Sequence, residues 1–129
     1  MTDERYACGK AQLEKMGGGS VEEMLDNLKG LSPDIERMAV EFVFGEVVCR
    51  PGLDLRTREI ATVAALTALG TAQVQLRAHI DTALNVGCTR DEIREVILQM
   101  MVYAGFPAAL NGMAVAKEVF GMRDAKGQS

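Results

Sequence analysis

Two stretches of this chain, Ile60–Leu69 and Ile97–Ala104, are almost entirely apolar and repeat their large side chains with a helical period. A helix that is apolar all round has to be covered all round. Neither stretch is long enough to cross a bilayer, so the protein interior or another subunit has to supply the cover. Two such helices are difficult to bury within 129 residues, a length that fits one domain. We therefore expect an all-α single domain that assembles as a homo-oligomer.

Helix start and stop signals divide the remainder of the chain, and no segment shows the sustained alternation of a half-buried strand. We interpret the run Gly17–Gly19 as a flexible joint after an N-terminal helix, because neither a preceding strand nor a P-loop lysine accompanies it. Residues 121–129 are polar and are expected to form a flexible, frayed tail. About six to seven helices are expected in one domain spanning 1–129. The second opens at Ser20, and the others cover residues 3–16, 33–49, 55–69, 71–87, 90–104 and 107–120.

Side chains that cap helix N-termini mark four of these boundaries. Ser20 and Thr89 each precede a glutamate by three residues, which is the pattern of a capping box. Ser32 stands before a proline at a first helical position, and Asp54 stands before the fourth helix, which Gly70 ends. These residues predict where the second, third, fourth and sixth helices begin.

The composition excludes several classes of partner. The net charge is −4 and no cluster of Lys and Arg is present, so nucleic acid is not expected to bind. The acidic start lacks an apolar segment, so we expect neither a secretory signal nor a membrane association. Cys8, Cys49 and Cys88 are far apart and accompany a single histidine. This pattern favours reduced thiols in a cytoplasmic protein over a disulfide framework or a metal site.

His79, the only histidine, shares a helix face with Ala72, Gln75, Ala83 and Val86. Two interpretations stay open. The ring is either a core residue bonded to a backbone carbonyl, or a site residue that faces a cavity. Burial lowers the pKa of a histidine and a neighbouring carboxylate raises it, so both effects act near neutral pH, where a general acid or base has to work.

Glu46 continues an apolar face of the third expected helix. A carboxylate on a buried face is costly unless it is paired or protonated, so Glu46 is either a functional residue or reaches solvent at the helix end. Arg50, four residues on, is placed to pair with Glu46 or to bind a substrate carboxylate. The face that we expect to be buried consists of Ile35, Met38, Ala39, Phe42 and Val43.

Glu59 is a second carboxylate on an apolar stripe, near the start of the fourth helix. The helix dipole favours an acid there, so a catalytic role is one of two alternatives. Arg58 beside it is placed to meet an anionic ligand, and Tyr103 is expected to face a cavity or a subunit boundary. Cys49 and Cys88 lie near helix ends, where a thiol is sometimes activated, although inert thiols are the simpler interpretation.

From about residue 38 to 120 the chain resembles the carboxymuconolactone decarboxylase family of the alkylhydroperoxidase D-like superfamily. The motifs that carry the resemblance are Phe44-Gly45-Glu46, Arg50-Pro51-Gly52-Leu53, Thr57-Arg58-Glu59, Leu76-Arg77-Ala78-His79, Asn85-Val86-Gly87, Thr89–Val96 and Tyr103–Ala109. The resemblance implies an all-helical alkylhydroperoxidase D-like subunit in a ring-shaped homo-oligomer, a trimer or a hexamer, with sites near subunit contacts.

The superfamily contains peroxidases as well as decarboxylases. The peroxidases carry a Cys-x-x-Cys before their histidine, and the two cysteine positions correspond to Ala72 and Gln75 in this chain. Because both thiols are absent, that dithiol mechanism cannot operate here. The resemblance implies instead a cofactor-free decarboxylation of 4-carboxymuconolactone or a related small carboxylated lactone, with no metal.

The chemistry of that reaction requires particular residue types. Electrons that leave the carboxylate flow into the unsaturated lactone, so the site needs a donor to the developing oxyanion and an acid that protonates carbon. Two alternatives stay open: a redox or antioxidant protein with peroxiredoxin-type activity that uses isolated cysteines, and a non-enzymatic oligomeric binding scaffold. The implied catalytic residues are His79, Glu46 and Glu59, and the implied residues that bind an anionic substrate are Arg50, Arg58 and Tyr103.

Overall fold

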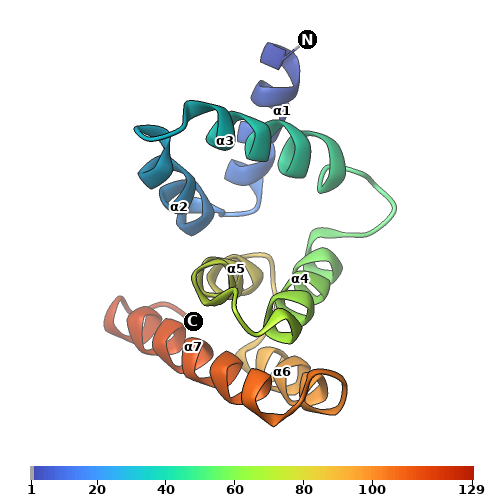
Figure 1. Ribbon diagram of the computed structural model, residues 1–129, viewed down its shortest axis with the longest axis vertical. Coiled ribbons are helices and arrows are strands. Elements are labelled where there is room, and N and C mark those ends of the chain that lie inside the picture. The colour runs from blue at the N-terminus through green and yellow to red at the C-terminus, as the bar shows by residue number, and fades with distance from the viewer. Residues whose placement is uncertain (1) are drawn as a thin grey trace.

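The computed structural model describes residues 2–129, which are entirely helical apart from turns and short connections, so the all-α prediction is confirmed. Figure 1 shows the helices in two groups, which meet where α2 packs on α5. We call the first group the N-terminal layer and the second group, α4–α7, the bundle. The helices are α1 Thr2–Lys15, α2 Gly19–Lys29, α3 Pro33–Met38, its π-helical continuation η1 Ala39–Val47, α4 Leu55–Leu69, α5 Gln73–Asn85, α6 Arg90–Ala104 and α7 Phe106–Ala125.

The bundle has an apolar core to which all four of its helices contribute. Val63, Ile80, Ile93 and Ile97 are completely buried in it. Gly112 on α7 lies directly against α4 and α6, where a Cβ atom would come within 2.9 Å of the Thr67 side chain. This close packing holds α7 against α4 and α6.

Capping in the bundle follows the sequence closely. The Asp54 carboxylate accepts a hydrogen bond of 2.7 Å from the Thr57 backbone N–H, and hydrogen bonding to the Thr57 side chain, followed by this backbone bond, lowers the pKa of Asp54. Gly70 ends α4 with a φ of 76°, in the left-handed region that favours glycine. Thr89 and Glu92 form the predicted capping box at the start of α6. The predicted starts of these two helices are therefore confirmed.

In the N-terminal layer, α1 packs along η1 with the two backbones in close approach. A Cβ atom at Gly9 would lie 2.2 Å from the Val40 carbonyl oxygen, and one at Gly45 would lie 2.4 Å from the Arg5 carbonyl oxygen. Only glycine fits at such distances, so these two glycines decide which side of η1 faces α1.

The predicted buried face of the third helix is wrong. Glu36, Val40, Glu41 and Phe44 are the buried residues of α3 and η1. The reason is that α1 approaches on the glycine side, and the wider π-helical turn shifts the residues that meet it. The large apolar residues are left partly or largely exposed on the opposite side, namely Ile35, Met38, Phe42 and Val43.

Three boundaries also differ from expectation. Ser20 does not cap α2, because its hydroxyl donates to Asp81 instead and the helix already begins at Gly19. The fifth helix begins at Gln73 rather than Thr71. The last helix continues past residue 120 to Ala125, because Arg123 is buried and pairs with Asp81. Among the described residues, no helix combines the length and apolarity needed to cross a membrane.

Candidate active site

His79 and Glu59 form an ion-pair contact between neighbouring helices of the bundle. Nδ1 of His79 on α5 lies 2.9 Å from Oε1 of Glu59 on α4. The Glu59 side chain is 1% exposed and the His79 side chain 14% exposed. The fully buried Ile80 lies beside His79 in the chain and anchors this part of α5 in the core. The structure thus brings together two side chains that the sequence singled out separately.

The contact fixes how the imidazole is used. A carboxylate that faces Nδ1 accepts a hydrogen bond from Nδ1–H. This bond orients the ring and leaves Nε2 as the ring nitrogen that can exchange a proton with a ligand. Nε2 makes no hydrogen bond within residues 2–129, and it does not belong to the buried nitrogen atoms that lack a partner. It therefore keeps some exposed surface and has no protein partner among the described residues.

Cys88 lies under the start of α4, in the part of the chain between α5 and α6. Its thiol is buried and donates a weak hydrogen bond of 3.8 Å to the Arg56 carbonyl oxygen. Burial raises the pKa of the Cys88 thiol, with Arg56 opposing the shift and Glu59 adding to it. Because a raised pKa keeps the thiol protonated, this cysteine is a poor nucleophile near neutral pH.

Arg58 is held by the connection that precedes α4. Its Nη2 donates a hydrogen bond of 2.9 Å to the Arg50 carbonyl oxygen, while its Nε is buried without a partner. Arg58 therefore keeps an unused donor, although much of its guanidinium is fixed. Arg50 itself is exposed and contributes only its backbone to this contact.

Two of the expected site residues lie apart from the His79–Glu59 pair. Glu46 at the end of η1 is exposed, and its Oε2 accepts a bond of 2.8 Å from Arg5 rather than from Arg50. Tyr103 near the end of α6 is 77% exposed and makes no hydrogen bond within the described residues through its hydroxyl. Within one subunit, neither side chain is hydrogen-bonded to His79 or Glu59.

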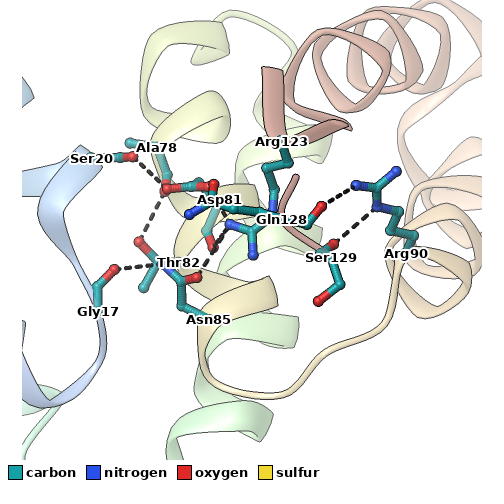
Figure 2. A network of polar contacts seen from close by, with 10 residues as sticks. All are labelled: Gly17, Ser20, Ala78, Asp81, Thr82, Asn85, Arg90, Arg123, Gln128 and Ser129. Atoms are coloured by element: carbon teal, nitrogen blue, oxygen red, sulfur yellow. Dashed lines mark hydrogen bonds and ion pairs between the residues drawn. The ribbon is translucent and has the colours of Figure 1, made fainter. Parts of the chain in front are cut away.

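A polar network around Asp81 and Arg123 was missed by the sequence interpretation, which placed Arg123 in a frayed tail (Figure 2). A usable signal was present, since Gly112, Val119 and Arg123 continue one face of α7 at helical spacing. Within residues 2–129, no three His, Cys, Asp or Glu side chains gather as candidate metal ligands.

The architecture defines an all-helical protein with a buried carboxylate–histidine pair between two helices of its bundle. Residues 33–118 match the model of the carboxymuconolactone decarboxylase family. The chain belongs to this family.

Three curated relatives span most of the chain. It is 41% identical to a 4-carboxymuconolactone decarboxylase of Acinetobacter baylyi over 122 residues, which cover 93% of this chain and 90% of the relative. It is 37% identical to an uncharacterised 15.0 kDa protein in the nqo9-nqo10 intergenic region of Paracoccus denitrificans, over 75% of this chain and 73% of the relative. It is 30% identical to the nitrosuccinic acid decarboxylase npaB of Metarhizium robertsii, over 92% and 82%.

Proposed function

We propose that the protein is a cofactor-free carboxy-lyase that acts on 4-carboxymuconolactone or a related small carboxylated lactone. The observation that carries the proposal is the contact between His79 Nδ1 and the buried Glu59 carboxylate, which leaves Nε2 accessible. Two curated relatives that cover most of the chain are named as decarboxylases, and both names refer to small carboxylated compounds.

In this decarboxylation a C–C bond of the substrate breaks and a C–H bond forms. The bond between the substrate and its carboxylate breaks, and carbon dioxide leaves without the bonding electron pair. That pair moves into the unsaturated lactone, where negative charge develops on oxygen. A proton then forms a C–H bond, so the net change is the loss of carbon dioxide and the uptake of one proton. The protein has to stabilise the anion and deliver the proton.

His79 supplies both requirements in this proposal. With Nδ1 directed at Glu59, a protonated ring presents Nε2–H to the substrate as an oxyanion donor or as the acid that protonates carbon. Glu59 touches His79 rather than the substrate, so its role is to position the ring and to hold its tautomer, as the carboxylate does in a catalytic triad. Glu59 is therefore a positioning residue.

The remaining proposed residues serve binding or assembly. Arg58 is the proposed anchor for a substrate carboxylate, since it lies beside Glu59 in the chain and, within residues 2–129, only Nη2 of its guanidinium is hydrogen-bonded. Arg50 and Tyr103 are exposed in one subunit and stay proposed as substrate-binding residues. Glu46 pairs with Arg5 in its own subunit. Its proposed catalytic role therefore requires that assembly bring it to the active site of a neighbouring subunit.

The proposed assembly is a homo-oligomer, a trimer or a hexamer. Two uncovered apolar patches support it, one on α3 and η1 and one where α6 meets α7. The second patch includes Val102, Tyr103 and Phe106, all more than half exposed. Sedimentation of Val102→Glu should show smaller particles than the wild type. The cysteines within residues 2–129 are free, and this supports the proposed cytoplasmic location.

The two alternative functions have less support. Peroxiredoxin-type chemistry needs an accessible thiolate beside the site. Cys88 is buried with a raised pKa, the exposed Cys49 makes no hydrogen bond to His79 or Glu59 within one subunit, and the positions before His79 carry Ala72 and Gln75. A pure scaffold predicts a histidine satisfied by backbone carbonyls, whereas His79 pairs with a carboxylate. The geometry therefore favours the decarboxylase.

The direct test adds purified protein to 4-carboxymuconolactone and follows the loss of its absorbance, with nitrosuccinate as a second substrate. The wild type should turn over at least one of them. His79→Ala should lower kcat by about 10²–10⁴-fold, the usual contribution of a positioned acid. Glu59→Gln should lower kcat with little change in KM and should alter the pH profile, because the ring loses its fixed tautomer.

Glu95→Gln is the matched control, since Glu95 is exposed on α6 and undergoes the same chemical change. It should keep wild-type kcat, and circular dichroism should show that all three variants are folded. Absence of turnover by the wild type on both substrates, or full activity of His79→Ala, would reject the proposal.

A further inference from the structure

A cleft of 840 Å³ lies between α2, α5 and α7, on a different side of α5 from the active-site pair. Ala78 and Asp81 line it, whereas His79 and Glu59 do not. At 3.6 residues per turn, His79 lies about 100° round the helix from Ala78. The volume falls in the range of roughly 300–1,000 Å³ that is typical of small-molecule sites.

One wall of the cleft carries a buried guanidinium with unused donors. Arg123 is 7% exposed, and its Nη1 bonds to Asp81 Oδ1 at 2.5 Å and to Asn85 Oδ1 at 3.2 Å (Figure 2). Its Nε is buried without a hydrogen-bond partner, and its Nη2 makes no hydrogen bond within residues 2–129. The Nε atom has no exposed surface, so Nη2, which is not fully buried, is the donor that a ligand in the cleft can reach.

The other charges around the cleft also favour an anion. Arg77 lines it and has a second buried Nε without a partner, while its Nη2 pairs with Glu118 at 3.0 Å. Lys126 is the third cation of the lining, against two carboxylates, Glu23 and Asp81. The Asp81 carboxylate is already engaged, because it accepts bonds from both Ser20 and Arg123.

Besides polar residues such as Gln75 and Asn27, the lining includes apolar side chains that are partly open to solvent. Leu28, Val74 and Met122 are each between 42% and 55% exposed in one subunit. Apolar side chains gathered in a concave surface are better covered by a ligand than by water. The apolar lining residues are Met24, Leu28, Val74, Ala78, Val119 and Met122.

We propose that this cleft binds a small amphipathic carboxylate at a second site, separate from the active site. The carboxylate accepts a hydrogen bond from Nη2 of Arg123 and lies near the charge of Arg77, and the apolar body lies along Leu28, Val74 and Met122. Arginine is suited to this role because its planar donors match a carboxylate. The site does not rest on the proposed decarboxylation, since it shares no side chain with the pair His79–Glu59.

The first experiment is a calorimetric titration of the full chain with octanoate, and in parallel with 1-octanol as the neutral match. Saturable binding of one octanoate per subunit with a Kd of about 1 mM or lower is expected, with octanol at least about tenfold weaker. The His79→Ala variant should bind octanoate equally well, so failure of the proposed reaction leaves this result intact. Absence of saturable octanoate binding, or equal binding of octanol, would overturn the proposal.

The second experiment uses variants of the lining. Leu28→Glu places a carboxylate on the rim and should weaken octanoate binding about tenfold or more, whereas Leu53→Glu, on the connection before α4, should not. Arg123→Lys keeps the charge opposite Asp81 but removes the planar donors, and it should weaken binding severalfold. Unchanged affinity in both lining variants overturns the proposal. The proposal is also overturned if Leu28→Glu, but not Leu53→Glu, lowers the mass of the oligomer. That result would show that a second copy of the chain covers the cleft.

Discussion

The bundle and the N-terminal layer each bury an apolar cluster, but they differ in the carboxylates that they bury beside it. In the bundle the buried cluster is apolar, and the buried Glu59 has His79 as its partner. In the N-terminal layer, Glu36 and Glu41 are nearly fully buried, while Ile35 and Phe42 are half exposed or more. In the N-terminal layer, large apolar side chains are exposed on the same helix that buries two carboxylates, whereas the bundle exposes apolar side chains such as Val102 and Phe106 where α6 meets α7.

The buried carboxylates of the N-terminal layer depend on single partners. Glu36 accepts a hydrogen bond of 2.7 Å from the Tyr6 hydroxyl, and this bond raises the pKa of Tyr6. Glu41 pairs with Arg37 through Oε1 at 3.0 Å, but its Oε2 is buried without a partner. Such pairs contribute little net stability, because the cost of removing the charges from water offsets their attraction. These contacts compensate for the burial of the carboxylates on the face that Gly9 and Gly45 place against α1.

The largest expected effect compares the same substitution in the two regions. Ile80 on α5 is fully buried, whereas Ile35 on α3 is 50% exposed. Ile80→Ala should lower the free energy of unfolding by about 2–5 kcal/mol, because it removes buried methylene groups and leaves a cavity. Ile35→Ala should change it by less than about 0.5 kcal/mol in dilute protein. Urea denaturation monitored by circular dichroism measures both.

The Ile35 variant also reports on assembly. If a second copy covers this face, its destabilisation should grow with protein concentration, because association stabilises the folded subunit. A loss for Ile35→Ala as large as that for Ile80→Ala at every concentration would contradict the contrast between the regions. Ile35 would then contribute to a core within its own subunit.

The next effect concerns the packing of α1 on η1. Gly9→Ala should lower the free energy of unfolding by about 1–3 kcal/mol, since the new Cβ atom overlaps the Val40 carbonyl and the helices must separate. Gly19→Ala is the matched control, because a Cβ atom there meets nothing within 4 Å. Hydrogen exchange should increase in α1 and η1 of the Gly9 variant and leave α4–α7 unchanged. Equal stability of the two alanine variants would show that the close approach does not matter.

The sequence predicts the bundle well because its information is local. Asp54, Gly70 and Thr89 each act on backbone groups within a few residues, so a cap or a stop can be identified without knowing the partner helix. Helical spacing also predicts the fold class and identifies His79 and Glu59, each by itself, as candidate site residues. It does not predict their contact, because that contact depends on how α4 and α5 are rotated against each other.

The N-terminal layer is harder to predict because the buried face of α3 and η1 depends on how α1 packs against it. The apolar residues of the third helix satisfy a helical period, and that period alone places Ile35 and Phe42 inside. The close approach at Gly9 and Gly45 and the π-helical turn of η1 place Glu41 there instead. Helical periodicity identifies an apolar face correctly, but it does not say whether the same chain or another one covers it.

A smaller effect on stability distinguishes Thr89, which caps a helix, from Ser20, which has the sequence pattern of a cap but does not cap α2. Thr89 accepts a hydrogen bond from the Glu92 backbone, whereas the Ser20 hydroxyl donates to Asp81 on another helix. Aspartate is a good N-cap residue, so Thr89→Asp should stay within about 0.5 kcal/mol of the wild type. Ser20→Asp should cost about 1 kcal/mol or more, because it loses the bond and places two carboxylates together. Equal tolerance of both substitutions would restore Ser20 as a cap.

The smallest effect compares the thiols of the two regions. Cys8 and Cys49 in and beside the N-terminal layer are exposed and should react readily with a disulfide reagent at pH 7.5, whereas the buried Cys88 should react only after unfolding. Because burial raises the folded pKa of Cys88, its contribution to stability is complete below the unfolded pKa of about 8.5 and is lost as the pH rises above it. The loss at pH 9 should amount to about 1 kcal/mol or less. Cys88→Ala should lack this part of the decline between pH 7 and 9, measured as a difference of unfolding free energies. Rapid labelling of Cys88 in the folded protein, or the same decline in Cys88→Ala, would contradict its burial and would restore the thiol as a candidate nucleophile.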